Sequence, residues 1–220
     1  MLAAILYDLD GTIVNTDPLH FQAWQELLRE YGIEIDEQFY KTRMSGRLNP
    51  AIVQDLLPEL SLEAGQKFCD RKEARFREIA AELTPLPGLL NLIAWGEEQG
   101  FKQAVVTNAP RDNANYMLKV LHLQHRFERV FIAEEIGIAK PNPGLYQYAL
   151  AYFNLSPEQG LAFEDSPSGI RAAVGAKIPT VGIASTQEPG ELYDLGAKLV
   201  ISDFTNSQLW ELLGVTKSEN

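Results

Sequence analysis

Apolar and polar positions follow two different patterns along this chain. Residues 3–7 are all apolar and are followed at once by Asp8, which is typical of a short strand buried on both faces of a sheet. From about residue 16 to residue 83 the apolar positions recur at helical spacing, and no alternating strand pattern interrupts them. The sequence therefore predicts one strand followed by an all-helical segment.

Start and stop signals divide the helical segment. The first helix is expected to begin at Thr16, where a polar cap residue precedes Pro18, and to end at Gly32. Trp24 lies on the apolar face of this helix, so packing is its expected role. Three more helices are expected over residues 37–44, 50–57 and 62–83.

Beyond residue 88 short β-rich runs alternate with helical stretches. The alternation predicts βαβ units and a parallel sheet covered by helices on both faces, an α/β fold with a Rossmann-like three-layer core. The expected strands are residues 103–107, 130–133, 161–163, 180–183 and 199–201, and the helices between them begin near Gly88, Arg111, Gly144, Ser168, Glu188 and Ser207.

The first strand is expected to join this sheet, which makes the predicted core discontinuous. Residues 1–14 and 86–220 would form the α/β core domain, and residues 15–85 a helical domain inserted into it. At the end of the chain, residues 216–220 are expected to be loose.

Composition excludes several classes of partner. The formal net charge of the 220 residues is −11, which argues against binding to nucleic acid or to an anionic membrane surface. The single cysteine, Cys69, allows neither an internal disulfide nor a cysteine-based zinc cluster. The chain shows no basic leader and no run long enough to span a bilayer. We expect a cytoplasmic monomer.

Four of the predicted strand ends carry residues whose side chains can act in catalysis or bind a ligand. Because the carboxyl ends of parallel strands meet at one edge of a sheet, these side chains are expected to lie together. Carboxylates held close resist ionising together, so a cation such as Mg²⁺ is expected between them. In chain order the residues are Asp8 and Asp10, Thr107 and Asn108, Lys140, and Glu164 and Asp165.

Each of these residues also has a simpler interpretation. Thr107 and Asn108 could cap the following helix, and Lys140 could be a solvated loop lysine. Glu164 could pair with an arginine, and Asp165 could cap a helix. Four independent coincidences at strand ends are less expected than one shared phosphate site.

The four motifs, in this order and spacing, resemble those of the haloacid dehalogenase superfamily over the whole chain. Within it the chain is similar to the subgroup of beta-phosphoglucomutase and related sugar-phosphate phosphatases, which carry a small α-helical cap. The resemblance implies a Mg²⁺-dependent phosphohydrolase that acts on a small phosphorylated metabolite, a sugar phosphate, through an aspartyl phosphate. A phosphoglucomutase and a non-catalytic metabolite-sensing or partner-binding module on the same fold are the alternatives.

The resemblance also implies a role for each motif residue. Asp8 would be the nucleophile, and Asp10 would protonate the leaving oxygen and then activate water. Thr107, Asn108 and Lys140 would bind the phosphate. The implied metal ligands are Asp8, Asp10 (through its backbone carbonyl), Glu164 and Asp165.

Further substrate contacts are implied on the helical cap. Arg47 would grip a distal phosphate or acid group of the substrate, because a planar donor fork suits a second anion. Lys72 could equally be an exposed helix lysine. The sequence departs from the mutase pattern at residues 109–111, where Ala, Pro and Arg stand in place of the Ser, Lys and Asn that help bind a bisphosphate. This departure favours phosphatase activity over mutase activity, although Arg111 could substitute for the missing bisphosphate contacts. The implied cap contacts are Thr16, His20, Arg47 and Lys72.

Overall fold

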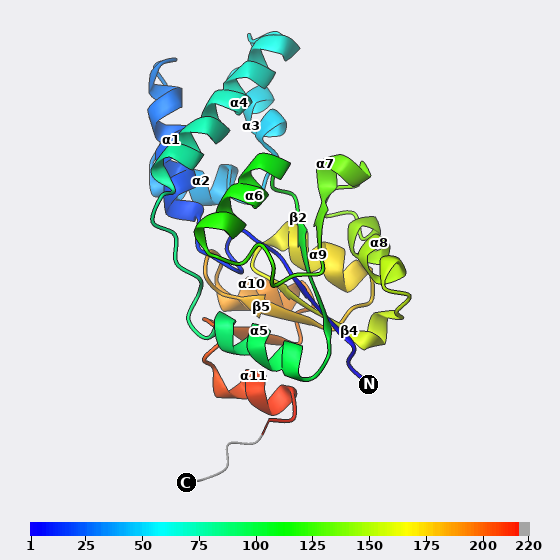
Figure 1. Cartoon of the computed structure of the whole chain (residues 1–220). Coiled ribbons are helices and arrows are strands. Elements are labelled where there is room, and N and C mark those ends of the chain that lie inside the picture. Colours follow the sequence, from blue (N-terminus) through cyan, green and yellow to red (C-terminus); the bar gives the residue numbers. More distant parts are fainter. Residues whose placement is uncertain (216–220) are drawn as a thin grey trace.

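A six-stranded parallel sheet forms the centre of the computed structural model, which describes residues 1–215 (Figure 1). Its strand order is β3-β2-β1-β4-β5-β6. The predicted α/β class with a parallel sheet is confirmed, while the expectation for residues 216–220 lies outside the described residues. The strands are β1 (Ala4–Tyr7), β2 (Lys102–Thr107), β3 (Arg129–Ile132), β4 (Gly160–Glu164), β5 (Thr180–Ile183) and β6 (Leu199–Ile201).

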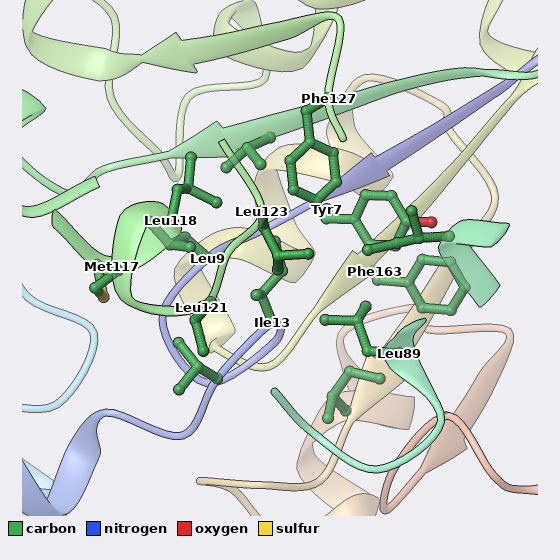
Figure 2. Packing of buried hydrophobic residues seen from close by; sticks show 14 of the residues in the cluster. Tyr7, Leu9, Ile13, Leu89, Met117, Leu118, Leu121, Leu123, Phe127 and Phe163 are labelled. Carbon is green, nitrogen blue, oxygen red and sulfur yellow. The ribbon is translucent and has the colours of Figure 1, made fainter. Parts of the chain in front are cut away.

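Helices cover both faces of the sheet and complete a three-layer core. Successive strand residues point to opposite faces, so Tyr7 and Val105 pack with α5, α6 and α11, whereas Leu6 and Val106 pack with α8 and α9. Figure 2 shows the first of these clusters, in which the ring of Tyr7 stacks on Phe163 at 5.6 Å. The helices of this part are α5 (Leu89–Glu98), α6 (Arg111–Val120), α7 (Ala133–Ile136), α8 (Gly144–Tyr152), α9 (Pro167–Gly175), α10 (Pro189–Asp194) and α11 (Ser207–Leu212), with a 3-10 turn η1 (Pro157–Gln159).

Four helices between β1 and α5 form a separate bundle beside the sheet (Figure 1). They have their own apolar core, in which Trp24 is 2 % exposed and packs on Phe68. We call this bundle the cap. Its helices are α1 (Asp17–Arg29), α2 (Glu37–Arg43), α3 (Asn49–Leu56) and α4 (Leu62–Ile79).

Two details differ from the sequence-based expectation. Helix α4 ends at Ile79 instead of residue 83, and the chain then runs back to the core through Pro85 and Pro87, which cannot continue a helix. The four-residue helix α7 was not predicted, because so short a turn leaves no periodic pattern to detect. Within residues 1–215, no helix is both long and apolar enough to cross a membrane.

Gly88 marks the return of the chain to the core and offers a test of this packing. Its φ is +78°, and a Cβ placed there would lie 2.6 Å from the backbone carbonyl carbon of Phe204. We expect Gly88→Ala to lower the free energy of unfolding by about 3 kcal/mol, from left-handed strain plus the backbone clash. Gly100 also has a positive φ, of +71°, but has no atom within 4 Å of its Cβ position. The matched control Gly100→Ala should therefore cost only about 1 kcal/mol by urea denaturation, and equal losses would contradict the proposed clash.

Candidate active site

Two strand ends bring the acidic residues together. The backbone N–H of Asp8 donates to the carbonyl of Phe163 at 3.0 Å, so the residues that follow β1 and β4 lie side by side. Carboxylate oxygens of Asp8, Glu164 and Asp165 all lie within 4.8 Å of one another, and the three residues are buried. The juxtaposition expected from the strand ends is therefore present for these acids.

Lys140 reaches into the same group from the loop after β3. Its Nζ lies 2.5 Å from Oδ1 of Asp8 and 2.6 Å from Oε1 of Glu164, and the residue is only 5 % exposed. The interpretation of Lys140 as a solvated lysine is wrong. Glu164 has this lysine and the hydroxyl of Tyr146, at 2.6 Å, as partners instead of an arginine.

Glycines leave the room that this crowding needs. A Cβ on Gly11, whose φ is +80°, would lie 2.1 Å from Oδ2 of Asp165. A Cβ on Gly169 would lie 1.7 Å from Oε2 of Glu164. Because no side chain fits either position, both acids can pack directly against backbone. Asp165 does not cap α9, since Ser166 takes that place and accepts from the backbone of Gly169.

The group carries more negative charge than one lysine can balance. Burial raises the pKa of Asp8 to about 8, although the Lys140 ammonium lowers it. Burial, followed by the charges of Asp8 and Glu164, raises the pKa of Asp165 well above its usual range. Burial acts against the charge of Lys140, but the two acids beside it raise its pKa overall.

The donor set fits a divalent metal ion. Among the described residues, Oε2 of Glu164 and Oδ1 of Asp165 are buried and have no hydrogen-bond partner, which is costly unless something cationic satisfies them. Carboxylate oxygens are ligands that hard ions such as Mg²⁺ prefer. Thr186 holds the other oxygen of Asp165 at 2.7 Å, so the unpartnered Oδ1 has a fixed orientation.

Asp10 lies apart from this acidic group. Its carboxylate accepts a hydrogen bond from Thr16 Oγ1 at 2.6 Å, and the same Oδ1 lies 3.3 Å from His20 Nε2. Both partners belong to the start of the cap, and the Asp10 side chain is 29 % exposed. The structure therefore brings the Asp10 side chain together with Thr16 and His20, next to the acidic group but not within it. The sequence did not predict these mutual contacts, since Thr16 and His20 were expected to contact the substrate.

Thr107 and Asn108 lie at the end of β2 and do not cap α6, which begins after Pro110. The Thr107 hydroxyl oxygen accepts from the N–H of Ala109 at 2.9 Å, which leaves its own O–H free to donate. The Asn108 side chain is used differently: it binds the backbone N–H and carbonyl of Lys140 at 3.0 and 3.1 Å. Asn108 thus anchors the loop that carries the lysine.

A cavity of about 810 Å³ lies between the cap and the strand ends. The predicted core residues meet it from one side and the predicted cap residues from the other. The site residues that line it are Asp8, Asp10, Thr107, Asn108, Lys140 and Asp165 from the core and His20, Arg47 and Lys72 from the cap.

The cap residues divide into two kinds. Lys72 is 2 % exposed, so the alternative of an exposed helix lysine is wrong; its Nζ lies 2.7 Å from His20 Nδ1 and 2.9 Å from Glu73. Arg47 is exposed and donates to Asp55 at 3.1 Å and to the carbonyl of Arg43 at 2.6 Å. Its guanidinium is thus engaged within the cap itself.

Sequence reasoning missed several supporting residues. Tyr146 and Thr186 hold the acidic pair, but each lies in a segment whose pattern shows only helix or turn. Glu73 and Asn113 bind one another between α4 and α6. For Glu73 the neighbouring Lys72 was an available signal, since a buried lysine needs a counter-charge; for Asn113 there was none.

Residues 5–183 match the family model described as haloacid dehalogenase-like hydrolase. The chain belongs to this hydrolase family. It is 28 % identical over 216 residues to validoxylamine A 7'-phosphate phosphatase of Streptomyces hygroscopicus subsp. limoneus, covering 97 % of this chain and 99 % of the relative. It is 27 % identical to beta-phosphoglucomutase of Bacillus subtilis, covering 99 % of both.

Solved structures agree with this assignment. CbbY from Rhodobacter sphaeroides in complex with phosphate superposes with a TM-score of 0.83 at 25 % identity, covering 94 % of this chain and 96 % of that one. A family IA hydrolase of the same superfamily from Entamoeba histolytica gives 0.85 at 26 % identity, covering 93 % and 94 %. The fold expected from the motifs is confirmed.

Removing one acid tests the charge crowding. Because burial and its neighbours raise the pKa of Asp165, its ionised form costs folded-state stability, and this cost grows as pH rises above the ordinary carboxyl pKa. We expect Asp165→Asn to raise Tm at pH 7 in EDTA by about 2–4 °C. Saturating Mg²⁺ should raise the Tm of the wild type more than that of the variant. The exposed control Asp194→Asn should change neither value, and a variant less stable in EDTA would contradict the crowding.

Proposed function

We propose that this protein is a Mg²⁺-dependent phosphatase that hydrolyses a small phosphorylated metabolite, a sugar phosphate, through an aspartyl phosphate on Asp8. The observation that carries the proposal is the contact of the Asp8 carboxylate with Lys140, beside Glu164 and Asp165 at the wall of the cavity. Phosphoryl transfer depends mainly on positioning and charge neutralisation, which this group of residues can supply.

The first step places the phosphorus against Asp8. One carboxylate oxygen of Asp8 attacks phosphorus, the bond from phosphorus to the substrate oxygen breaks, and an acyl phosphate forms on Asp8. Lys140 offsets the negative charge of the phosphoryl group, and the free O–H of Thr107 donates to one of its oxygens. Asp8, Glu164 and Asp165, with the backbone carbonyl of Asp10, would hold Mg²⁺, which when bound neutralises phosphoryl charge.

Asp10 handles the protons of both steps. In the first step its carboxylic acid gives a proton to the leaving sugar oxygen. In the second step the resulting carboxylate takes a proton from the water that attacks the acyl phosphate, and inorganic phosphate leaves. Thr16 and His20 bind this carboxylate, so the start of the cap sets where it points.

Two arginines favour hydrolysis over a mutase reaction that uses a bisphosphate. Arg47 pairs with Asp55, and Arg111 pairs with Glu135. These are the side chains that the sequence suggested for a second anion, and each has a carboxylate of the same chain as its partner. A phosphorylated carbohydrates phosphatase of Thermotoga maritima, 28 % identical over 91 % of this chain and 94 % of its own, supports a sugar phosphate as substrate.

We also propose that the enzyme is a cytoplasmic monomer that requires no nucleic acid or membrane. Every group given a role above comes from one chain, so the site needs no second copy. The only cysteine, Cys69, is buried in the cap, and burial raises its pKa to about 11, so the thiol is unreactive.

The proposal predicts that purified protein releases phosphate from members of a panel of sugar phosphates in Mg²⁺ and loses this activity in EDTA. Asp8→Asn should lower kcat by at least about 10³-fold, because the nucleophile is gone. Asp194→Asn, an exposed aspartate change, is the matched control. With p-nitrophenyl phosphate, whose leaving group needs no proton from Asp10, Asp10→Asn should accumulate a phosphorylated protein, visible by intact-mass spectrometry, because water is no longer activated.

Three results would overturn this function. Full turnover by Asp8→Asn would exclude the covalent route. Formation of an isomeric sugar phosphate without free phosphate, stimulated by a sugar bisphosphate, would show a phosphoglucomutase instead. Binding of phosphate esters without any turnover would show a metabolite-sensing module.

A further inference from the structure

A line of polar contacts, buried at Asn113, Glu73 and Lys72 and partly buried beyond them, runs from the core helix α6 through the cap to Asp10. Asn113 on α6 donates through Nδ2 to Oε2 of Glu73 on α4. Lys72 Nζ lies 2.9 Å from Oε1 of Glu73 and 2.7 Å from Nδ1 of His20 on α1. His20 Nε2 then lies 3.3 Å from Oδ1 of Asp10. The line leaves the core at α6 and returns to it at the candidate acid.

With Lys72 as an ammonium ion paired with Glu73, the donors and acceptors along this line fit one arrangement. An ammonium group can only donate, so the Nδ1 of His20 must accept from Lys72. Neutral His20 then carries its proton on Nε2 and donates it to Asp10. Glu73 accepts from Lys72 and Asn49 through Oε1 and from Asn113 through Oε2. Burial alone would raise its pKa, but Lys72 and the hydrogen bond from Asn49 lower it to about 2. Asn113 is the one of these three partners that belongs to the core.

Asn113 is itself clasped by two side chains of α4. Arg77 Nη1 donates to its Oδ1 at 2.6 Å, which orients the amide so that Nδ2 faces Glu73. Glu73 and Arg77 are four residues apart and therefore lie on one face of the helix. Asn113 is 1 % exposed and occupies the place where α4 of the cap meets α6 of the core. Its amide thus joins cap and core through one donated and one accepted hydrogen bond.

We propose that Asn113 is a positioning residue for Asp10. By holding Glu73 across the boundary between cap and core, it fixes the Lys72–His20 pair, and that pair directs the Asp10 carboxylate toward the leaving oxygen. This role rests on the proposed phosphatase function. It ties proton donation to the docking of the cap, because the contact exists only where α4 lies against α6.

The role has a kinetic signature that simple structural support lacks. A sugar alkoxide is a poor leaving group and needs the proton of Asp10, whereas p-nitrophenolate leaves readily as an anion and does not. Loss of acid positioning should therefore lower kcat/KM, which reports the first phosphoryl transfer, selectively for sugar phosphates. Hydrolysis of the acyl phosphate uses Asp10 with either substrate, so kcat does not separate them. Damage to the nucleophile, the metal site or the cap as a whole should slow both substrates alike.

The primary test compares Asn113→Ala with Asn115→Ala, a change at an exposed position of the same helix. Asn113→Ala should lower kcat/KM for a sugar phosphate by about tenfold or more, with kcat/KM for p-nitrophenyl phosphate within about twofold of wild type. Asn115→Ala should leave both substrates unaffected. Circular dichroism and Tm establish that each variant is folded.

A second test exchanges the donor and the acceptor of the hydrogen bond between Asn113 and Glu73, with side chains of nearly unchanged shape. Asn113→Asp alone places a carboxylate against Glu73 and should reproduce the selective loss. Adding Glu73→Gln in that background restores a hydrogen bond, with the amide now on α4, while the amide oxygen can still accept from Lys72. The double variant should recover most of the sugar-phosphate rate. This test stands even if Asn113→Ala does not fold.

Several outcomes would overturn the inference. An equal loss of kcat/KM with both substrates would show general support of the cap. A raised KM with unchanged kcat would show direct contact with the substrate, and unchanged kinetics would show no role. A failed rescue by the double variant would also count against it. Inactivity of the wild type toward every phosphate ester would instead contradict the proposed function, and the wild type alone shows this without any variant.

Discussion

The crowding of three buried carboxylates around one ammonium group is the interaction on which this site depends. Lys140 contacts Asp8 and Glu164, and Asp165 lies beside them. Burial, together with the negative neighbours, raises the pKa of Asp8 and of Asp165. Such a group is unfavourable by itself, and two of its buried oxygens have no partner among the described residues. A divalent cation converts the same arrangement into a favourable one, and the cation makes the place attractive to a phosphate ester. The electrostatic cost and the candidate function therefore have one origin.

The sheet and the cap hold different halves of the chemistry. Asp8 is held by the pairing of β1 with β4 and by Lys140, so its place is part of the core. Asp10 follows two residues later, yet its carboxylate is bound by Thr16 and His20 at the start of the cap. In the proposed mechanism the covalent step thus relies on the sheet, whereas proton transfer relies on how the cap is docked.

Much of the fold could be predicted because its signals are local. Strand and helix periods repeat over a few residues, and the parallel sheet follows from their alternation. The residues at the strand ends could likewise be proposed, since the carboxyl ends of parallel strands meet at one edge of the sheet. Short elements such as α7 and the exact end of α4 could not, because local preference there is weak and packing prevails. Arg47 and Arg111 show the same limit: their carboxylate partners, Asp55 and Glu135, depend on how loops approach one another.

The linear order of residues was enough to establish the fold class, the family resemblance and the acids at the strand ends, because these follow from short-range patterns and from motifs of fixed spacing. It could not establish which polar groups satisfy one another. Residues distant in the chain meet in three such places: Lys72 is buried, Glu73 and Arg77 bind Asn113, and the Asp10 side chain contacts the cap. Such contacts arise only when packed helices exclude water and each buried donor must find an acceptor nearby.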